Sequence, residues 1–332
     1  MLGARIEDDC LRIGDRFAVS FQRTLRIPDD GRTYPLPPGL GRFPILKIED
    51  HLDRVPELWH ETGGMFIPMY QREALWISFS AASWKPNAVT VSVGGVNAVS
   101  GESDDGRLHA QPQNYLVCPN QPWLDGINSG RDSIRQFVAM PLGLGYTVES
   151  IKGEETLGGI QITVFEPKPG RFADHPPTPT LGAVPMSRLE RMEPQLGLGA
   201  GGSVRQKIYL DPYGLEAWEP QPQARFWVHI VNSLQFEHIT GSKPPPTPIT
   251  TKSYLECSLP WFDLYDEALD AVSPPSSLAT ARTVAERDAE LGVTCNDDSF
   301  EVPDSRILKL HGEGGAQSSP VSPRASARKS EK

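Results

Sequence analysis

Residues 73–101 read EALWISFSAASWKPNAVTVSVGGVNAVSG, and this stretch decides the fold class. At its start, Leu75, Ile77 and Phe79 alternate with tryptophan and serine, and three valines repeat the alternation farther along. An apolar side chain at every second position is typical of a β-strand that turns one face toward a core. The glycines at 94–95 fit either a two-residue hairpin turn or a β-bulge. The stretch therefore predicts short strands joined by tight turns.

The strand pattern recurs on both sides of this stretch. Apolar and β-branched residues are concentrated in further segments at 17–27, 136–142, 146–151 and 158–167. The chain has 30 glycines and 32 prolines, which break helices and separate strands. Strands do not alternate with long helices, which disfavours a parallel sheet. The fold is therefore predicted to be mainly β, α+β overall, with an antiparallel β-sandwich or barrel formed by residues 1–167.

The composition changes after residue 167. Residues 168–202 are rich in proline and glycine and are predicted to form a linker or a long loop. Their last part, LGLGAGG at 196–202, has the glycines of a dinucleotide-binding loop but lacks the flanking strand and helix, so we interpret it as a connector. Residues 203–310 are predicted to be a mixed segment of short strands and helices that packs on the first part. Residues 311–332 are predicted to be a disordered, basic, serine-rich tail.

Three features of the mixed segment can be predicted. A strand is expected to end near Asn232, and Ser233 is expected to cap a short helix that follows it. The segment WFDLYDEALDAV at 261–272 is expected to be helical, which would place its acidic side chains on one face. A later helix is expected to end at Gly292.

Charge and cysteine content exclude several classes of function. The net charge of −10 argues against nucleic-acid binding, which needs a positive surface. The four cysteines are too far apart for a zinc knuckle and too few for a disulfide framework, so they are expected to be reduced thiols. A signal sequence and an apolar run of membrane-spanning length are both missing from the sequence. We therefore expect a soluble cytoplasmic protein with no membrane partner, no metal and no cofactor, and leave a nuclear location open.

Polar side chains lead directly into several apolar strands. Arg72 and Glu73 precede ALWISF, Arg135 precedes the strand of residues 136–142, and Asp125 stands within PWLDGI. Arginines beside carboxylates form bidentate networks. Two interpretations stay open: the network braces the sheets, or it lines a polar pocket at one end of the barrel. His229 is a candidate general base if a carboxylate lies beside it, and otherwise a structural histidine.

Seven tryptophans and the tail supply the other candidate sites. Trp123 and Trp261 follow prolines and are candidates for a binding surface, with core packing as the alternative. Ser319 and Ser322 precede prolines and Ser326 follows an arginine, so these serines are candidate phosphorylation sites. A passive, solvated tail is the alternative to that interpretation.

Several long motifs resemble an uncharacterised family of fungal and bacterial hypothetical proteins. The motifs are PMYQREALWISF, GGVNAVSGE, RQFVAMPLGLGYTVE and LPWFDLYDE, and the resemblance spans roughly residues 10–310. No activity, cofactor or catalytic residue is known for that family, so the resemblance assigns no role to any residue of this chain.

The function that these features favour is that of a β-rich binding or interaction protein. A protein or glycan partner would contact the polar strand ends and surface aromatic rings, and a small-molecule ligand is also compatible with them. The alternative is an enzyme of specialised metabolism with an acid/base pocket between strands, built from the charged residues named above. A third hypothesis is a scaffold that phosphorylation of the tail regulates.

Overall fold

The computed structural model describes residues 2–153, 155–175, 196–248, 250–256, 260–264, 269–294 and 299–310. The candidate phosphorylation sites Ser319, Ser322 and Ser326 lie outside the described residues, as do Cys257 and Cys295. Most of the predicted linker lies outside them too.

Seventeen of the strands belong to one sheet. They are β1 (Ala4–Glu7), β2 (Cys10–Ile13), β3 (Phe17–Thr24), β4 (Thr33–Tyr34), β5 (Gly39–Arg42), β6 (Leu46–Lys47), β7 (Met65–Met69), β8 (Ala74–Ala81), β9 (Asn87–Val93), β10 (Val96–Asn97), β11 (Leu116–Cys118), β12 (Trp123–Leu124), β13 (Gly126–Asn128), β14 (Ile134–Pro141), β15 (Ile160–Phe165), β16 (Leu196–Val204) and β17 (Ala224–Asn232). A separate parallel pair is formed by β18 (Trp261–Leu264) and β19 (Ile307–Leu310).

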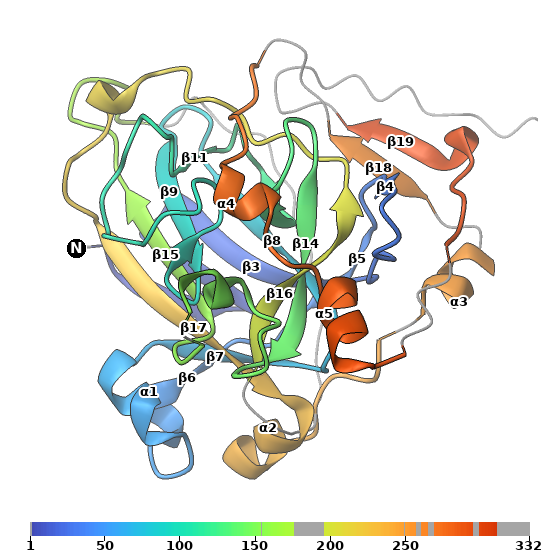
Figure 1. Cartoon of the computed structure of the whole chain (residues 1–332). Helices are drawn as coiled ribbons and strands as arrows, with labels where there is room; N and C mark the ends of the chain where they lie inside the picture. Colours follow the sequence, from blue (N-terminus) through green and yellow to red (C-terminus); the bar gives the residue numbers. More distant parts are fainter. Residues whose placement is uncertain are drawn as a thin grey trace, which may run out of the picture.

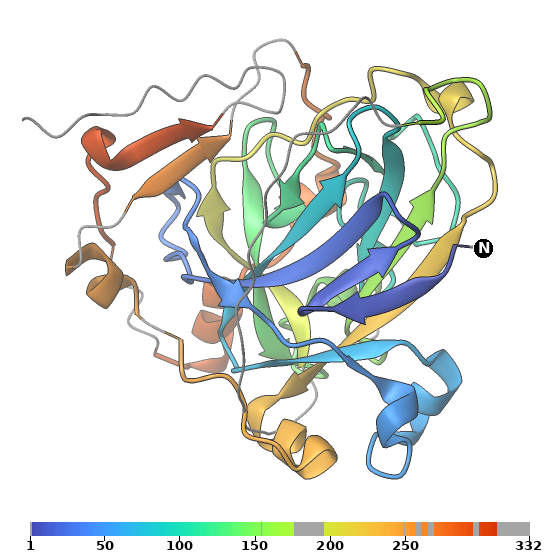
Figure 2. The same ribbon diagram turned by 180° about the vertical axis from the view of Figure 1, so that it is seen from behind.

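Most neighbouring strands of the large sheet are antiparallel. In one half β2, β3, β8, β14 and β16 pair in succession, and in the other half β9, β15 and β17 do so. The halves meet where Leu196 pairs with Ile230, and β7 and β4 add parallel pairs to β17 and β16. The sheet curves around an apolar core that takes side chains from both halves (Figure 1). From behind, the β1–β2 hairpin is seen to extend the sheet beyond β3 (Figure 2). The mainly β fold class is thereby confirmed.

The stretch that decided the fold class forms β8, β9 and β10. The alternation in β8 is real, because Leu75, Ile77 and Phe79 are buried between side chains that are more exposed. Gly94 and Gly95 form the two-residue turn between β9 and β10, and both have positive φ, +53° and +74°. A hairpin turn of this kind needs two left-handed residues, which glycine adopts at little cost. Of the two alternatives left open by the sequence, the structure has the hairpin turn.

The glycine-rich stretch at 196–202 is most of strand β16, so its interpretation as a connector is wrong. Glycine is required there because other segments approach the strand closely. A Cβ atom on Gly199 would lie 2.7 Å from the carbonyl oxygen of Tyr146, and one on Gly202 would lie 2.2 Å from that of Pro28. Both β16 and β17 pair with strands from the first 167 residues. The proposed division of the chain into domains stays a prediction.

The predicted helix at 261–272 is also wrong at its start. Residues Trp261–Leu264 form strand β18, which is held by the isolated bridge between Phe262 and Leu36 and by pairing with β19. Asp263 therefore lies on a strand, and Asp266 and Glu267 lie outside the described residues. The expected acidic helix face does not form at Asp263, because tertiary pairing has overridden the local helical spacing.

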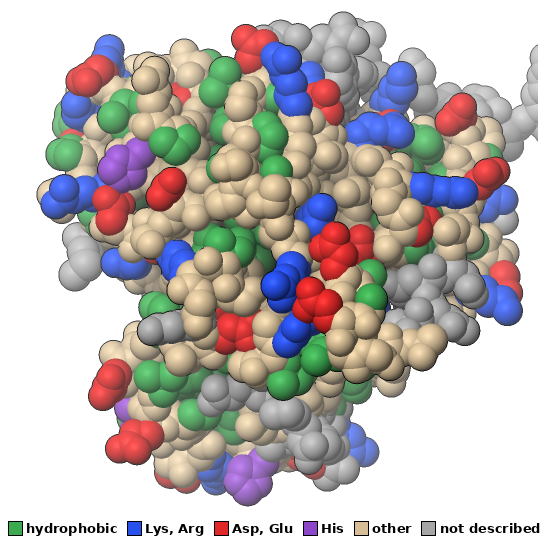
Figure 3. Space-filling model, in the orientation of Figure 1, with side chains coloured by type: hydrophobic (Ala, Val, Ile, Leu, Met, Phe, Trp, Pro, Cys, Tyr) green, Lys and Arg blue, Asp and Glu red, His purple; other side chains and the backbone are tan. Residues whose placement is uncertain are grey.

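The helices of the described residues are short and lie around the outside of the sheet (Figure 1). They are α1 (Glu57–Thr62), α2 (Ser233–Thr240), α3 (Thr251–Glu256), α4 (Ser276–Ala279) and α5 (Val284–Leu291), with 3-10 turns at Ile48–His51, Val148–Lys152, Leu215–Ala217 and Asp304–Arg306. The predicted change from strand to helix between Asn232 and Ser233 is confirmed, and so is the end of α5 at Gly292, which has φ +68°. On the face shown in Figure 3, charged side chains of both signs gather over α5, where Arg282 and Arg287 pair with Glu290.

Replacing Thr283 by alanine is expected to lower the free energy of unfolding by about 1 kcal/mol. Thr283 begins α5 with a reciprocal capping box: its hydroxyl accepts from the N–H of Glu286 at 3.1 Å, and the Glu286 carboxylate accepts from the N–H of Thr283 at 2.8 Å. Urea unfolding measures the effect. Thr280→Ala is the matched control, because the exposed Thr280 hydroxyl only donates to the carbonyl of Ser276. Equal stability of the two variants would contradict the capping argument.

Candidate functional site

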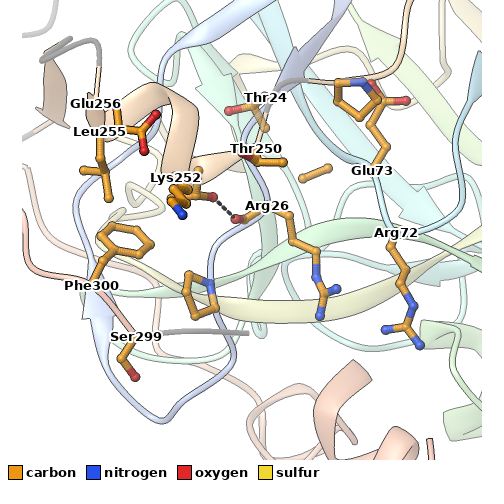
Figure 4. Close-up of a pocket in the computed structure, with 14 residues that line it drawn as sticks. Thr24, Arg26, Arg72, Glu73, Thr250, Lys252, Leu255, Glu256, Ser299 and Phe300 are labelled. Carbon is orange, nitrogen blue, oxygen red and sulfur yellow. Dashed lines mark hydrogen bonds between the residues drawn. The ribbon is translucent and has the colours of Figure 1, made fainter. Parts of the chain in front are cut away.

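A cavity of about 510 Å³ lies where β3 ends and β8 begins, beside α3 (Figure 4). Its lining comes from the stretches 24–28, 72–74, 250–256 and 299–300 and from Pro248. Thr24 and Ala74 pair across β3 and β8, and the Thr251 hydroxyl donates to the carbonyl of Arg26 at 3.0 Å. Four segments that are far apart in the sequence are thereby brought to one site.

Glu73 lies in the wall of this cavity with both carboxylate oxygens occupied. The Arg23 guanidinium donates to Oε1 at 2.7 Å, and the backbone N–H of Tyr70 donates to Oε2 at 2.9 Å. Burial raises the pKa of Glu73, and the charge of Arg23 opposes that shift. Arg23 and Tyr70 also donate to the carbonyls of Pro246 and Pro245, at 2.7 and 2.9 Å. The side chains of Arg23 and Tyr70 therefore fix residues 245–246, the proline segment that leads to α3.

Arg72 lies beside Glu73 and faces a different carboxylate. Its two terminal nitrogens donate to the two oxygens of Asp288 at 2.8 and 2.7 Å, and the Tyr146 hydroxyl donates to Asp288 at 2.7 Å. Burial alone would raise the pKa of Asp288, but these hydrogen bonds and the charges of Arg72 and Arg26 hold it below its usual value. Arg72 adopts φ +69°, an uncommon conformation for a residue with a side chain. In Figure 4 Arg26 and Arg72 extend to the same side of the cavity.

Asp125 and Arg135 do not join Arg72 and Glu73 at the cavity. Asp125 lines a separate pocket of about 200 Å³ near Trp123, and its carboxylate accepts from the side-chain amide of Gln206 at 2.9 Å. Arg135 on β14 donates to the carbonyl of Ala281 at 2.8 Å. The network of four residues that the sequence suggested is therefore divided among three places in the fold.

His229 lines neither of these two pockets and lies in a packed aromatic environment. Its ring stacks on Trp59 at a centroid distance of 4.4 Å and on Trp227 at 5.8 Å. Nε2 lies 3.0 Å from the hydroxyl of Thr62, and no carboxylate of the described residues forms an ion pair with it. Burial lowers the pKa of His229 to about 4, so the ring is neutral at pH 7. This geometry corresponds to the structural alternative for His229.

The two candidate tryptophans differ in exposure. Trp123 is half-buried on β12 and lines the same pocket as Asp125. Trp261 is 0% exposed, because β18 places it in the core against Tyr254 and Phe300. A side chain without exposed surface offers no contact to a partner, so for Trp261 the structure has core packing and not the binding surface.

Arg26 and Lys252 line the cavity, although the sequence did not single them out. Arg26 follows β3, and Lys252 lies in the first turn of α3 and extends toward Phe300 (Figure 4). The pattern around Arg26, RTLRIP, carries no feature that separates it from other arginines near strand ends. Only the position of α3 beside the end of β3 shows that these two cations border the same cavity.

The cavity combines positive charge, hydroxyl groups and an apolar surface. Arg26, Arg72 and Lys252 contribute the charge, the threonines of positions 24, 250 and 251 contribute hydroxyls, and Leu255 and Phe300 are apolar. Among the described residues, no three histidine, cysteine, aspartate or glutamate side chains are arranged to hold a metal ion. In the same part of the chain, no helix has the length and apolar character needed to cross a bilayer.

Comparisons of the chain with protein-family models, with curated proteins and with solved structures find no match. The resemblance to a family of hypothetical proteins therefore stays a prediction.

Proposed function

We propose that the protein binds a small organic anion in the cavity between β3, β8 and α3. The ligand class is a molecule with a carboxylate or phosphate group and an apolar part. The observation that carries this proposal is a cavity of about 510 Å³ with Arg26, Arg72 and Lys252 along its lining. Ligand pockets of this size commonly combine an apolar surface with a few polar groups that fix the orientation of the ligand.

The charge balance around the cavity supports an anionic ligand. The lining carries Arg26, Arg72 and Lys252 together with the carboxylates of Glu73 and Glu256. Arg23 pairs with Glu73 and Asp288 pairs with Arg72, so these groups together hold one more cation than carboxylates. The chain as a whole has a net charge of −10, so a local excess of positive charge is unusual for this surface. Arginine binds carboxylate and phosphate groups through paired N–H donors. The Thr250 hydroxyl, which lies 2.9 Å from that of Ser253, offers a further donor to the same group, whereas the Thr24 hydroxyl already donates to the carbonyl of Pro38.

A binding role fits this geometry better than acid/base catalysis. A general base needs a titratable group within hydrogen-bond reach of the substrate. Glu73 is the buried carboxylate in the cavity wall, and Arg23 and Tyr70 occupy its two oxygens. Asp125 and His229 lie outside the cavity lining.

Phenyl phosphate is a suitable probe because it joins a dianion to one apolar ring. We expect it to raise the melting temperature with increasing concentration, and benzyl alcohol, which lacks the charge, to have no comparable effect. Arg26→Gln is expected to weaken phenyl phosphate binding by about 10- to 100-fold, since a hydrogen bond to a charged group contributes about 1.5–3 kcal/mol. Isothermal titration measures both affinities.

Lys243→Gln is the matched control for Arg26→Gln, because Lys243 is exposed and lies outside the cavity lining. The control should keep the affinity of the unchanged protein. Equal binding of phenyl phosphate by Arg26→Gln and by the unchanged protein would show that the cavity is not the anion site. Stronger binding of benzyl alcohol than of phenyl phosphate would remove the case for an anionic ligand.

A further inference from the structure

A second pocket, of about 200 Å³, is walled by aromatic rings and has a carboxyl group in its lining. Trp76 comes from β8, Trp123 from β12 and Phe262 from β18, and the stretch 36–39 completes the wall. We call this site the Trp76–Trp123 pocket. None of its lining residues lines the cavity that we assign to the anion.

The aromatic walls are held in place by ring packing and by backbone hydrogen bonds. The rings of Trp76 and Trp123 have centroids 5.9 Å apart and are inclined by 58°, so they form two sides of a corner. Gly39 lies against the edge of Trp76, where a Cβ atom would be 3.1 Å from Cζ2. Phe262 is held by two backbone hydrogen bonds with Leu36, of 2.7 and 2.9 Å. All three rings are half-buried, which leaves part of each accessible to a ligand.

Asp125 is 1% exposed and is held in position by one neutral side chain. The side chain of Gln206 accepts from the backbone N–H of Asp125 at 3.0 Å and donates to its Oδ2 at 2.9 Å. No lysine or arginine among the described residues forms an ion pair with this carboxyl group. Burial without a cation raises the pKa of Asp125 to about 8, so the group is mostly protonated at pH 7.

The charged groups on the neighbouring segments have other partners. Next to Gln206 in sequence, Arg205 pairs with Asp263 at 2.7 Å and Lys207 lies 3.8 Å from Asp132. On β14, which pairs with the strand after Asp125, Arg135 donates to the carbonyl of Ala281. The pocket itself has no basic residue in its lining. Among the described residues, no lysine or arginine of these neighbouring segments therefore serves as the counter-ion of Asp125.

We propose that the Trp76–Trp123 pocket binds a small organic cation, an N-alkylated ammonium group, with Asp125 as its counter-ion. Aromatic faces attract cations through the negative charge of their π surface, and tryptophan does so most strongly. N-alkyl groups also match the apolar character of the walls. A cation in the pocket would favour the charged form of Asp125, and the carboxyl proton would pass to solvent when the cation binds.

The test compares choline with 3,3-dimethylbutan-1-ol, a neutral molecule of nearly the same shape. Isothermal titration of the full chain at pH 7 is expected to show at least tenfold tighter binding of choline. Titrations in two buffers of different ionisation enthalpy should show the release of close to one proton per bound choline. The affinity for choline should rise as the pH increases from 6 to 8, because less of Asp125 must then be deprotonated on binding.

Three variants locate the binding at this pocket. Trp123→Leu and Asp125→Asn are expected to weaken choline binding at least tenfold, and Asp125→Asn should also abolish proton release. Trp84→Leu is the control, since Trp84 lies outside the pocket and packs against Arg16. Circular dichroism would confirm that each variant is folded, and Asp125→Asn keeps the size of the side chain.

Three results would overturn the proposal. One is equal or tighter binding of the neutral alcohol, which would mark the pocket as a site for uncharged apolar molecules. Another is unchanged choline affinity in folded Trp123→Leu. The third is the absence of heat or of a change in tryptophan fluorescence with choline at concentrations up to tens of millimolar. None of these results bears on phenyl phosphate binding, which Arg26→Gln tests separately.

Discussion

Replacing Gly202 by alanine is expected to lower the free energy of unfolding by at least about 3 kcal/mol. A Cβ atom at this position would lie 2.2 Å from the carbonyl oxygen of Pro28 and 2.8 Å from that of Ile27. Both atoms belong to the backbone, so they cannot turn aside as the end of a flexible side chain could. The N–H of Ile27 donates to the buried side chain of Gln136 at 2.9 Å, which further fixes this segment.

Two properties make Gly202 informative about the glycine-rich strand. Its φ lies outside the left-handed region, so alanine would suit the local backbone, and the loss of stability reports only the close approach. Chemical unfolding followed by circular dichroism measures the effect. Gly3→Ala is the matched control, because a Cβ at Gly3 meets no atom within 4 Å, and its stability should change by less than about 0.5 kcal/mol. A Gly202→Ala protein as stable as the control would contradict the packing of β16 against residues 27–28.

The second large effect is expected from Arg23→Met, which should lower the free energy of unfolding at pH 7 by about 3–5 kcal/mol. The Arg23 and Glu73 side chains are only 9% and 1% exposed, so removal of the guanidinium leaves a carboxylate buried without a cation. The variant also loses the hydrogen bond to the carbonyl of Pro246. The guanidinium also lies over the ring of Phe43, 5.7 Å from its centroid, and methionine, which keeps the apolar stem of the side chain, loses this cation–π contact as well.

The pH dependence of Arg23→Met follows from the sign of the shift at Glu73. Burial raises the pKa of Glu73 and Arg23 opposes the shift, so removal of Arg23 raises that pKa further. A carboxyl group whose pKa is raised by folding favours the folded state at low pH and loses that contribution as the pH increases. The destabilisation by Arg23→Met should therefore be largest at neutral pH and smaller near pH 5.

Controls separate charge burial from the loss of side-chain volume. Arg5→Met breaks the pair of Arg5 with Glu7 and should change the stability far less than Arg23→Met does, because water screens this exposed pair. The double variant Arg23→Met, Glu73→Gln should recover part of the stability, because the neutral amide that replaces the carboxylate needs no cation. Equal stability of Arg23→Met and Arg5→Met at pH 7 would show that the buried ion pair is not needed in the fold.

Part of the site could be predicted from its position in the sequence. Arg72 and Glu73 precede an apolar strand, and the structure places both in the lining of the cavity. The partner of each was not predictable, because Arg23 is 50 residues away from Glu73 and Asp288 is 216 residues away from Arg72. The same distance in sequence explains why Arg26 and Lys252 were missed.

The burial of single side chains also depended on long-range pairing. Trp123 and Trp261 both follow prolines, but β12 leaves the first half-buried and β18 carries the second into the core. Asp125 is removed from solvent by Gln206, which lies 81 residues farther along the chain. No local pattern in PWLDGI indicates whether its carboxylate reaches water.

The sequence left the turn at Gly94 and Gly95 open between a hairpin and a bulge, and its strand pattern at 146–151 is wrong, because Val148–Lys152 form a 3-10 turn. By itself it determined the strands that became β3, β8, β9, β14 and β15, and the helix boundaries at Ser233 and Gly292. These features depend on side-chain alternation, backbone freedom and caps, all of which act within a few residues. The tertiary structure decided that the glycine-rich stretch is a strand, that Trp261–Leu264 is not a helix, and which charged groups meet. Those outcomes depend on contacts between distant segments, whose burial and pairing energies exceed the local preferences of a short stretch.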